Sequence, residues 1–498
     1  MHGGHMKSPR KTGLITVGIV CVSASLLAAN VIIPNLTPFR DRSGYVSTYN
    51  VHGDIDESNP FFQELGTNGR TCATCHQLDE SMGLELKHIQ QRFAESGGTD
   101  PLFAPVDGAN CPDAQKGNAN AHSLLLNNGV IRVGITLPEE TEFNIAVVSD
   151  PYGCAITTDP ITGRPTISVY RRPLPATSLG FLSAVMWDGR ETKAPLNDEK
   201  TFLQNLKIDL RQQAIDAVLG HSQAQHPPTE SQLAEIVNFE LGLFTAQVSD
   251  DRAGVLYQGG ARGGPVELAR QPYYPGINDS LGHDPHGKKF DPKVFDLYRS
   301  WIDDNAQNDP ETNPEQRAAR AAIAAGEQIF NSAPLKITAV RGLNDNPDLG
   351  YPKEIDGTCT TCHDTPNVGN HSFPLPLDIG TSHSASNEQD PNIAAALAQL
   401  SQPVTPVFLI NNCPDRQDPS RTLAFYTSDP GKGLITGKCS DVNRGKGPVL
   451  RGIPARAPYF HNGSAANLTE LVNFYDKRFQ MNLSEQQKRE LVAFLNSL

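Results

Sequence analysis

The sequence has no excess of positive charge. Its 42 Lys and Arg residues stand against 55 Asp and Glu residues, which gives a formal net charge of −13 at pH 7. Proteins that bind nucleic acid neutralise phosphates with Lys and Arg, so this balance argues against nucleic acid as a partner. An acidic surface promotes solubility and can also help a basic partner protein to dock.

Zinc ligands at the usual spacing are also missing. The sequence contains two C-x-x-C pairs, and neither is followed closely by another C-x-x-C or by H-x-x-x-H, which would complete a zinc site. Each pair is instead followed at once by a histidine. The two C-x-x-C-H segments consist of Cys72, Cys75 and His76 and of Cys359, Cys362 and His363.

Each C-x-x-C-H segment has the pattern of covalent haem attachment. The two cysteines, one helical turn apart, can form thioethers with the haem vinyl groups, and the histidine can supply an imidazole to the iron. A redox disulfide is the alternative for an isolated pair. Two complete copies in one chain instead predict two covalently bound haem c groups.

The N-terminal segment lacks a clear cleavage pattern. Polar and basic residues precede an apolar stretch from Leu14 to Ile33, which predicts an export signal or a membrane anchor over residues 1–34. Neither Ala28 nor Ala29 has a small residue two positions before it, and Cys21 lacks the small residues of a lipoprotein site. In either case we expect the rest of the chain to lie in the periplasm, where haem c is attached.

Four of the nine cysteines belong neither to the haem motifs nor to the N-terminal segment. An even number of cysteines in an oxidising compartment suggests two disulfides. Three connectivities are possible. We expect the sequence-local one, Cys111–Cys154 with Cys413–Cys439, which keeps one bridge in each haem half.

Helical periodicity is strong in a few segments, although 42 glycines and 38 prolines indicate many loops. Ser484 and Gln487 form a capping box that predicts the start of the last helix. Alternation of apolar and polar residues predicts a short hairpin. The expected helices cover residues 202–219, 229–247, 314–331 and the chain after 484, and the hairpin covers residues 142–148.

Two further motifs carry a resemblance. W-D-G-R (Trp187–Arg190) lies between the two C-x-x-C-H segments, and P-Y-F-H-N-G-S (Pro458–Ser464) follows the second. In this order the motifs resemble the bacterial di-haem cytochrome c peroxidase family, which includes MauG. The resemblance covers about residues 59–498, with longer inter-motif segments, as in extended MauG-like proteins. It implies a mainly α fold of two cytochrome c-type domains with long loop insertions, over residues 45–310 and 311–498.

The resemblance also implies roles for single residues. His76 would be the proximal ligand of an N-terminal, peroxidatic haem, and His363 that of a C-terminal, electron-transferring haem. Trp187 would relay electrons between them, the alternative being a tryptophan that only packs at a chain reversal.

The peroxide pocket departs from the family pattern. Gln213 matches the position of the family's distal glutamine, but no glutamate stands at the position of its distal acid, and His221 and Gln223 fall nearby instead. Cleavage of a peroxide needs a group that moves a proton between its oxygens, and histidine does this at neutral pH. We therefore expect His221 to take this role, unless it only caps the helix beside Gly220.

The sixth ligands follow less directly. Tyr475 stands where the peroxidases carry methionine and MauG carries tyrosine, and Met481 is its rival at the C-terminal haem. Phenolate ligation would lower the haem potential, and thioether ligation would raise it. His371 is a further candidate, but it lies only eight residues from His363. Weak candidates for the N-terminal haem are Met82, His88 and His122.

The family also binds calcium between its domains, partly through backbone carbonyls at positions that match Arg456 and Pro458 here. The side-chain ligand position is occupied by Arg172, whose charge would oppose a cation. Calcium is therefore a doubtful cofactor.

The resemblance implies a periplasmic enzyme that reduces hydrogen peroxide with electrons from a small donor protein, a c-type cytochrome or a cupredoxin. Three alternatives stay open. They are MauG-like oxidation of a protein or organic substrate, a RoxA-like haem oxygenase acting on a hydrophobic polymer, and a di-haem electron carrier that is not an enzyme.

Overall fold

The computed structural model describes residues 1–3, 31–115, 117–302, 312–415, 418 and 420–498. The expected export segment from Leu14 to Ile33 lies almost wholly outside these ranges. Within the ranges, no helix is both long and apolar enough to cross a membrane.

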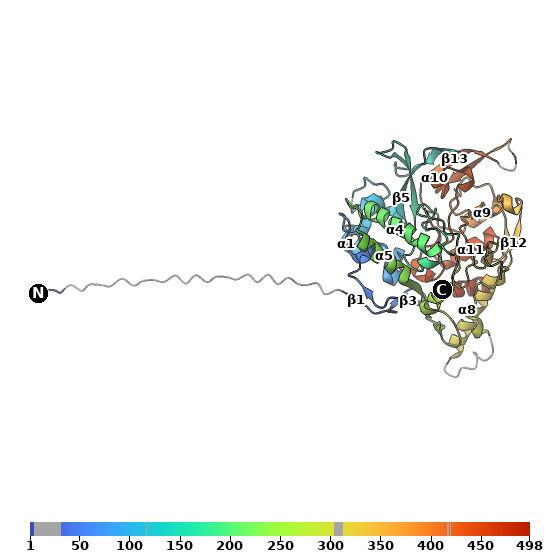
Figure 1. Cartoon of the computed structure of the whole chain (residues 1–498), viewed down its shortest axis with the longest axis horizontal. Helices are drawn as coiled ribbons and strands as arrows, with labels where there is room; N and C mark the ends of the chain where they lie inside the picture. The colour runs from blue at the N-terminus through green and yellow to red at the C-terminus, as the bar shows by residue number, and fades with distance from the viewer. Residues whose placement is uncertain (4–30, 116, 303–311, 416–417, 419) are drawn as a thin grey trace.

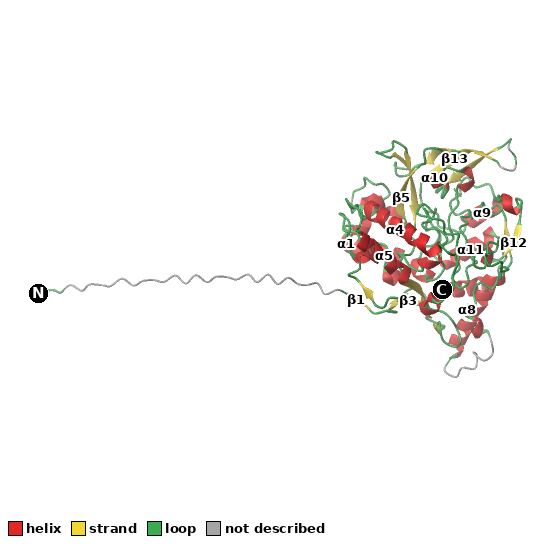
Figure 2. Cartoon of the chain, in the orientation of Figure 1, coloured by secondary structure: helices red, strands yellow, loops and turns green. Residues whose placement is uncertain are grey.

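The fold is mixed rather than mainly α, with 32% helix and 17% strand (Figure 2). The N-terminal half lies on one side in Figure 1 and the C-terminal half on the other. The helices are α1 (Leu86–Ser96), α2 (Pro105–Gly108), α3 (Ser123–Asn128), α4 (Phe202–Gly220), α5 (Glu230–Gly242), α6 (Pro265–Ala269), α8 (Pro314–Ser332), α9 (Pro391–Leu397), α10 (Gly433–Thr436), α11 (Leu468–Arg478) and α12 (Glu485–Leu495).

The strands of the described residues form five antiparallel sheets. Their orders are β1-β4, β10-β9-β3-β2, β11-β12, β14-β13-β6 and β5-β8-β7. The strands are β1 (Ile32–Ile33), β2 (Pro38–Arg40), β3 (Gly44–Asn50), β4 (Ile55–Asp56), β5 (Ile131–Thr136), β6 (Asn144–Ser149), β7 (Ile156–Thr158), β8 (Pro165–Arg171), β9 (Leu243–Asp250), β10 (Gly254–Val255), β11 (Leu335–Ile337), β12 (Ile355–Gly357), β13 (Val407–Pro414) and β14 (Thr422–Thr427).

Most expected helices form close to their predicted ends. Helices α4, α8 and α12 match, and the side chain of Ser484 caps α12 by accepting from the backbone N–H of Gln487. Helix α5 is shorter than expected because it ends at Gly242, and the chain continues directly into β9. Strand β9 pairs with β3 and buries Leu243 and the run from Thr245 to Gln247, and this tertiary contact outweighs the local helical periodicity.

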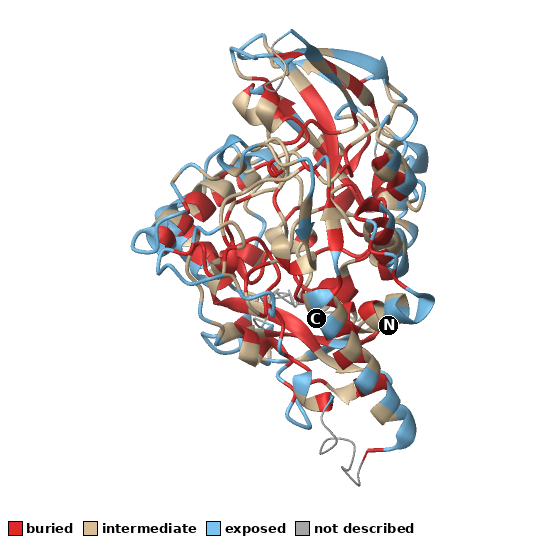
Figure 3. Cartoon of the chain, turned by 90° about the vertical axis from the view of Figure 1, so that its right-hand side faces the viewer, coloured by how far each residue is buried: buried red, intermediate tan, exposed pale blue. Residues whose placement is uncertain are grey.

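The predicted hairpin at residues 142–148 is wrong. The segment forms one strand, β6, whose partner is β13 from the other half of the chain. Ile145 pairs with Ile410, and Val147 pairs with Phe408. The strand is mostly exposed, at the top of Figure 3. A strand's partner cannot be deduced from its own alternation, because the pattern identifies only a strand and its two faces.

The core around the second haem motif uses residues from both sides of the expected boundary between residues 310 and 311. Before the boundary it includes buried residues between Ala253 and Trp301. After the boundary it includes buried residues of α8, α11 and α12. Helices α8 and α12 approach closely at Gly326, where an added Cβ would lie 2.0 Å from the carbonyl oxygen of Glu490. The packed unit that contains the second motif therefore extends back to about Ala253.

Both expected disulfides are confirmed. Cys111 is bonded to Cys154 and Cys413 to Cys439, across sequence separations of 43 and 26 residues. A crosslink stabilises mainly by restricting the unfolded chain, by about 4 kcal/mol for loops of this size.

We expect the double substitution Cys413→Ala/Cys439→Ala to lower the free energy of unfolding by about 3–4 kcal/mol in urea denaturation. An unchanged unfolding midpoint would contradict this expectation.

Candidate functional site

Each C-x-x-C-H motif lines its own largely apolar cavity. The first cavity is enclosed by the first motif, by one face of α4 and by part of α5. The second is enclosed by the second motif, by β11 and by parts of α11 and α12. The four motif cysteines are not joined in disulfides. Two such cavities suit two groups that are large, flat and apolar, with a thioether attachment point in each wall.

The histidines of the two C-x-x-C-H motifs are oriented in the same way. Nδ1 of His76 donates to the carbonyl oxygen of Met82 at 3.2 Å, and Nδ1 of His363 donates to that of Gly369 at 2.6 Å. In each case the acceptor lies six residues after the histidine. The arrangement leaves Nε2 available for an iron atom. Burial lowers the pKa of His76 to about 4, so its imidazole is neutral, as a metal ligand must be.

A pair of threonines fixes the start of each motif. The backbone N–H of Thr71 donates to Oγ1 of Thr74 at 3.0 Å, and that of Thr358 donates to Oγ1 of Thr361 at the same distance. These contacts hold the short helical turn that sets the spacing between the two cysteines. The residues present therefore fit covalently attached haem c in both cavities.

Helix α4 brings both predicted peroxide-pocket residues to the first cavity. Gln213 and His221 line it, together with Ala214 and Ala217 of the same helix. His221 directly follows the last residue of α4, and its backbone N–H donates to the carbonyl of Ala217. His221 is therefore both the residue that ends the helix and a residue of the cavity wall.

Asp107 is a partner of His221 that the sequence pattern does not reveal. Nδ1 of His221 is hydrogen-bonded to the Asp107 carboxylate, which also forms a buried ion pair with Arg70. Burial works against the ionised form of Asp107, but His221 and Arg70 outweigh it and hold the pKa of the carboxyl below its usual value. With Nδ1 held by a carboxylate, Nε2 is the nitrogen that can accept and return a proton.

Glu240 is a second residue missed by the sequence pattern. It lies on α5, lines the first cavity, and burial raises the pKa of its carboxyl to about 8. Its Oε2 has no hydrogen-bond partner among the described residues. At neutral pH this carboxyl is largely protonated. Its position on the helix face shared by Leu233, Ile236 and Val237 was a usable signal, because a lone acid on an apolar face is unusual.

Trp187 lies in the wall between the two cavities. Its neighbour Met186 lines the first cavity, whereas Trp187 lines the second, and Pro173 and Lys446 border both. The indole Nε1 donates to the carbonyl of Arg172 at 2.8 Å. Burial lowers the pKa of Lys446 to about 7. This placement is compatible with a role of Trp187 between the two cavities.

The remainder of W-D-G-R forms a buried charge cluster beneath Trp187. The guanidinium of Arg171 binds Asp429 at 2.6 and 2.9 Å and also binds Asp188, and all three side chains are at most 4% exposed. Burial of Asp188 disfavours its charged form, but Arg171 and Arg190 outweigh this effect and lower its pKa to about 2. The cluster ties the W-D-G-R turn to β8 and to the C-terminal half.

Both predicted sixth-ligand candidates line the second cavity. Tyr475 and Met481 are among its wall residues, as are His371 and His461. Burial raises the pKa of the Tyr475 phenol above its ordinary value, so without a metal the phenol stays protonated. The ring centroid of His461 lies 6.2 Å from that of Trp187. Burial lowers the pKa of His461 to about 4.

The weak candidates for the first cavity lie elsewhere. None of Met82, His88 and His122 is among the described residues that line it. Met82 supplies the carbonyl that orients His76, and His88 is paired with Glu80. His122 packs on Phe103, with its Nδ1 bonded to a backbone carbonyl.

Arg172, which stands at the position of the family's side-chain calcium ligand, is bonded to three backbone carbonyls. Its guanidinium donates to the carbonyl oxygens of Leu84, of Gly129 at 2.7 Å and of Arg456 at 3.1 Å. A calcium ion would need oxygen ligands of this kind. The guanidinium and a calcium ion would therefore compete for the same backbone carbonyls.

Comparison with known proteins gives partial matches. A sequence family described as RoxA-like, cytochrome c-like matches residues 446–481. The cytochrome-c peroxidase IdrP1 of Denitromonas iodatirespirans is 26% identical over 206 residues, which cover 37% of this chain and 50% of that protein. The cytochrome c551 peroxidase of Nitrosomonas europaea is 37% identical over 78 residues, which cover 15% of this chain and 23% of that protein. The chain thus spans half or less of the length of these relatives.

Among solved structures, a MauG-like protein associated with microbial copper homeostasis aligns with 70% of this chain and 79% of its own, at 13% identity and a TM-score of 0.28.

Proposed function

Because the chain is a distant homologue of the di-haem cytochrome c peroxidases and MauG-like proteins, we propose that it is a periplasmic di-haem c enzyme that reduces hydrogen peroxide. The observation that carries this proposal is the pairing of His221 with Asp107 in the wall of the His76 cavity. The haem iron supplies the redox chemistry, in which peroxide takes up two electrons and two protons to give two water molecules.

The chain's own residues manage the protons and the position of the substrate. His76 is held by the Met82 carbonyl, so its free nitrogen faces the cavity in one fixed orientation. His221, held by Asp107, takes the proton of the incoming peroxide and delivers it to the departing oxygen. Gln213 contributes an amide that can hydrogen-bond to the bound peroxide, and Glu240 is a further protonated group in the same wall.

The second cavity supports entry of electrons. His363 would hold the second haem, Tyr475 or Met481 would supply a further ligand, and Trp187 would couple the two cavities. An acidic chain with a net charge of −13 would attract a small basic donor, a c-type cytochrome or a cupredoxin. The two disulfides favour the oxidising periplasm over the cytoplasm.

Two observations favour alternative activities. Tyr475 in the second cavity favours MauG-like oxidation of a protein or organic molecule, and the RoxA-like match over residues 446–481 favours a haem oxygenase. An oxygenase of this kind would form a stable complex of its reduced state with dioxygen, which a peroxidase would not need.

The proposal is tested by electron paramagnetic resonance and optical spectra of the oxidised holoprotein, before and after one equivalent of peroxide. We expect one high-spin haem and a response of both haems to peroxide. In Tyr475→Phe, loss of the response would favour the MauG-like activity. In Met481→Leu, loss of a methionine charge-transfer band would favour the peroxidase. Two low-spin haems whose spectra do not change with peroxide, even after partial reduction, would identify an electron carrier and contradict the proposal.

A further inference from the structure

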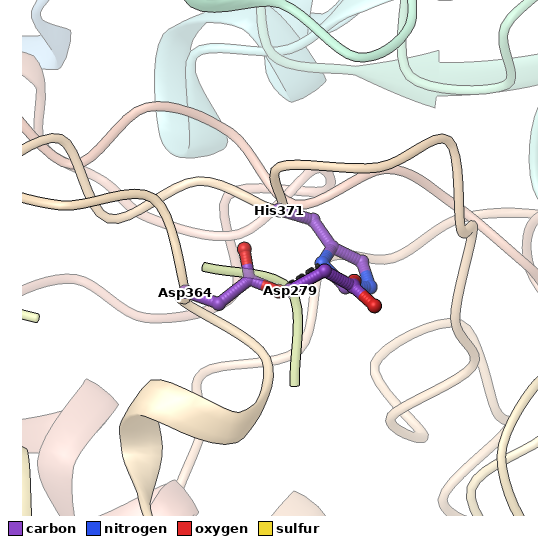
Figure 4. A group of neighbouring side chains, drawn as sticks. All are labelled: Asp279, Asp364 and His371. Atoms are coloured by element: carbon purple, nitrogen blue, oxygen red, sulfur yellow. Dashed lines mark hydrogen bonds and ion pairs between the residues drawn. The ribbon is translucent and has the colours of Figure 1, made fainter. Parts of the chain in front are cut away.

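A buried group of three side chains lies beside the second haem motif and has no part in the function proposed above. Asp279 comes from the loop after α6, Asp364 directly follows His363, and His371 follows on the same loop. Their side chains are buried, with residue exposures of 1%, 0% and 3%. One potential ligand atom from each lies within 4.8 Å of the others (Figure 4).

Hydrogen bonds account for only some of the polar atoms in this group. Nδ1 of His371 lies 3.0 Å from Oδ2 of Asp364, whose Oδ1 accepts from the backbone N–H of Ser372 at 2.7 Å. Oδ2 of Asp279 accepts from the backbone N–H and the Nδ1 of His283 at 2.9 and 2.8 Å.

Two atoms of the group are left over. Oδ1 of Asp279 and Nε2 of His371 have no hydrogen-bond partner among the residues that the structure describes. Both belong to side chains that are more than nine-tenths buried, and Figure 4 shows the imidazole of His371 and the carboxylate of Asp279 directed to the same side of the group. Buried polar atoms are nearly always satisfied in folded proteins, so this pair points to a missing binding partner.

The charges specify the kind of partner. Two carboxylates and one imidazole keep a net negative charge in either protonation state of His371, and a buried net charge is costly unless it is neutralised. An imidazole nitrogen beside a carboxylate oxygen suits a divalent transition metal, whereas calcium and magnesium prefer oxygen ligands alone.

We propose that Oδ1 of Asp279 and Nε2 of His371 bind one divalent transition-metal cation of the type of Zn²⁺ or Mn²⁺, while Asp364 orients the imidazole through its Nδ1. Ligand atoms on one zinc ion lie at most about 4.2 Å apart, because each bond is about 2.1 Å long. Binding would therefore draw the potential ligand atoms of the group, which lie within 4.8 Å of one another, closer together.

The cation would fix the loop that orients the second haem ligand. Gly369, whose carbonyl accepts from His363, lies between Asp364 and His371 in the sequence. The loop that carries Asp279 already contacts the motif, since Oγ of Ser280 donates to the carbonyl of Thr361 at 2.7 Å. The proposed role of the cation is thus to hold this loop against the haem motif, without contact to peroxide.

The test is a metal analysis of purified holoprotein, dialysed against Zn²⁺ or Mn²⁺ and then freed of unbound metal. We expect one zinc or manganese per chain in addition to two haem irons. Asp279→Asn and His371→Gln should each weaken retention at least tenfold. Asp284→Asn is the matched control, because Asp284 is a buried carboxylate of the same loop that bonds to Tyr274 instead.

Wild-type protein that retains neither ion beyond its haem irons would overturn the proposal, even if the variants fail to fold. His371 would then be assigned to a haem contact, since it also lines the second cavity. Equal retention by wild type and both variants would overturn it as well. The measurement involves no peroxide, so its outcome is independent of the proposed peroxidase activity.

Discussion

Replacing His221 by alanine is expected to lower the rate of peroxide reduction by about 10²–10⁴-fold, the usual contribution of a positioned acid–base group. The reason is the loss of the only imidazole among the described residues that both lines the first cavity and is held by a carboxylate, Asp107. The haem and its proximal ligand should be unaffected. Stopped-flow measurement of peroxide consumption with a reduced donor gives the rate.

His226→Ala is the matched control. His226 follows α4 in the same loop, but it is exposed and is not among the described residues that line the cavity. Its replacement should leave the rate of peroxide reduction within a factor of about two, because the side chain is exposed and does not reach the cavity. The free energy of unfolding should also change by less than about 0.5 kcal/mol, as is usual for surface substitutions. A His221→Ala variant with full activity would show that this histidine only ends α4, and Glu240 would then be the next proton donor to replace.

Replacing Arg171 by methionine is expected to lower the free energy of unfolding by about 3–5 kcal/mol at pH 7. The substitution leaves the carboxylate of Asp429 buried and without its guanidinium partner, at 3% exposure. An uncompensated buried charge costs more than the ion pair contributes. Urea denaturation followed by circular dichroism measures the change.

A double variant separates the lost ion pair from lost packing. Arg171→Met/Asp429→Leu removes both charges and should recover part of the loss. Asp251→Asn is the control, since Asp251 pairs with Arg40 at an exposed position and should cost at most about 1 kcal/mol. A single-variant loss no larger than that of the control would contradict the prediction.

The effect of pH on this cluster has a definite sign. Arg171 and the neighbouring His461 outweigh burial and hold the pKa of Asp429 below its usual value in the folded protein. Its contribution is therefore complete above the unfolded pKa of about 3.9 and is lost as the pH falls through the folded value. In Arg171→Met, burial without the guanidinium raises the pKa of Asp429, so the variant is relieved of its buried charge at a higher pH. The difference in stability between wild type and Arg171→Met should therefore shrink as the pH falls, and shrink further below about pH 4, where the wild type loses its own contribution.

The sequence by itself determined the local chemistry of this protein. The C-x-x-C-H spacing is a property of one helical turn, so the residues from Cys72 to His76 could be proposed as a haem-attachment site without a fold. The capping box at Ser484 and the periodicity of α4 are local for the same reason. An even remainder of four cysteines predicted two disulfides but left three connectivities open, and the structure has the sequence-local one that we expected.

The tertiary structure alone decided which distant residues meet. Asp107 reaches His221 across 114 positions, and Asp279 lies beside His371 although neither belongs to a recognisable motif. The pairing of β6 with β13 is of the same kind. Periodicity specifies which face of an element is buried, whereas the partner of that face depends on how the whole chain packs, and a carboxylate or imidazole acquires its role only from such a partner.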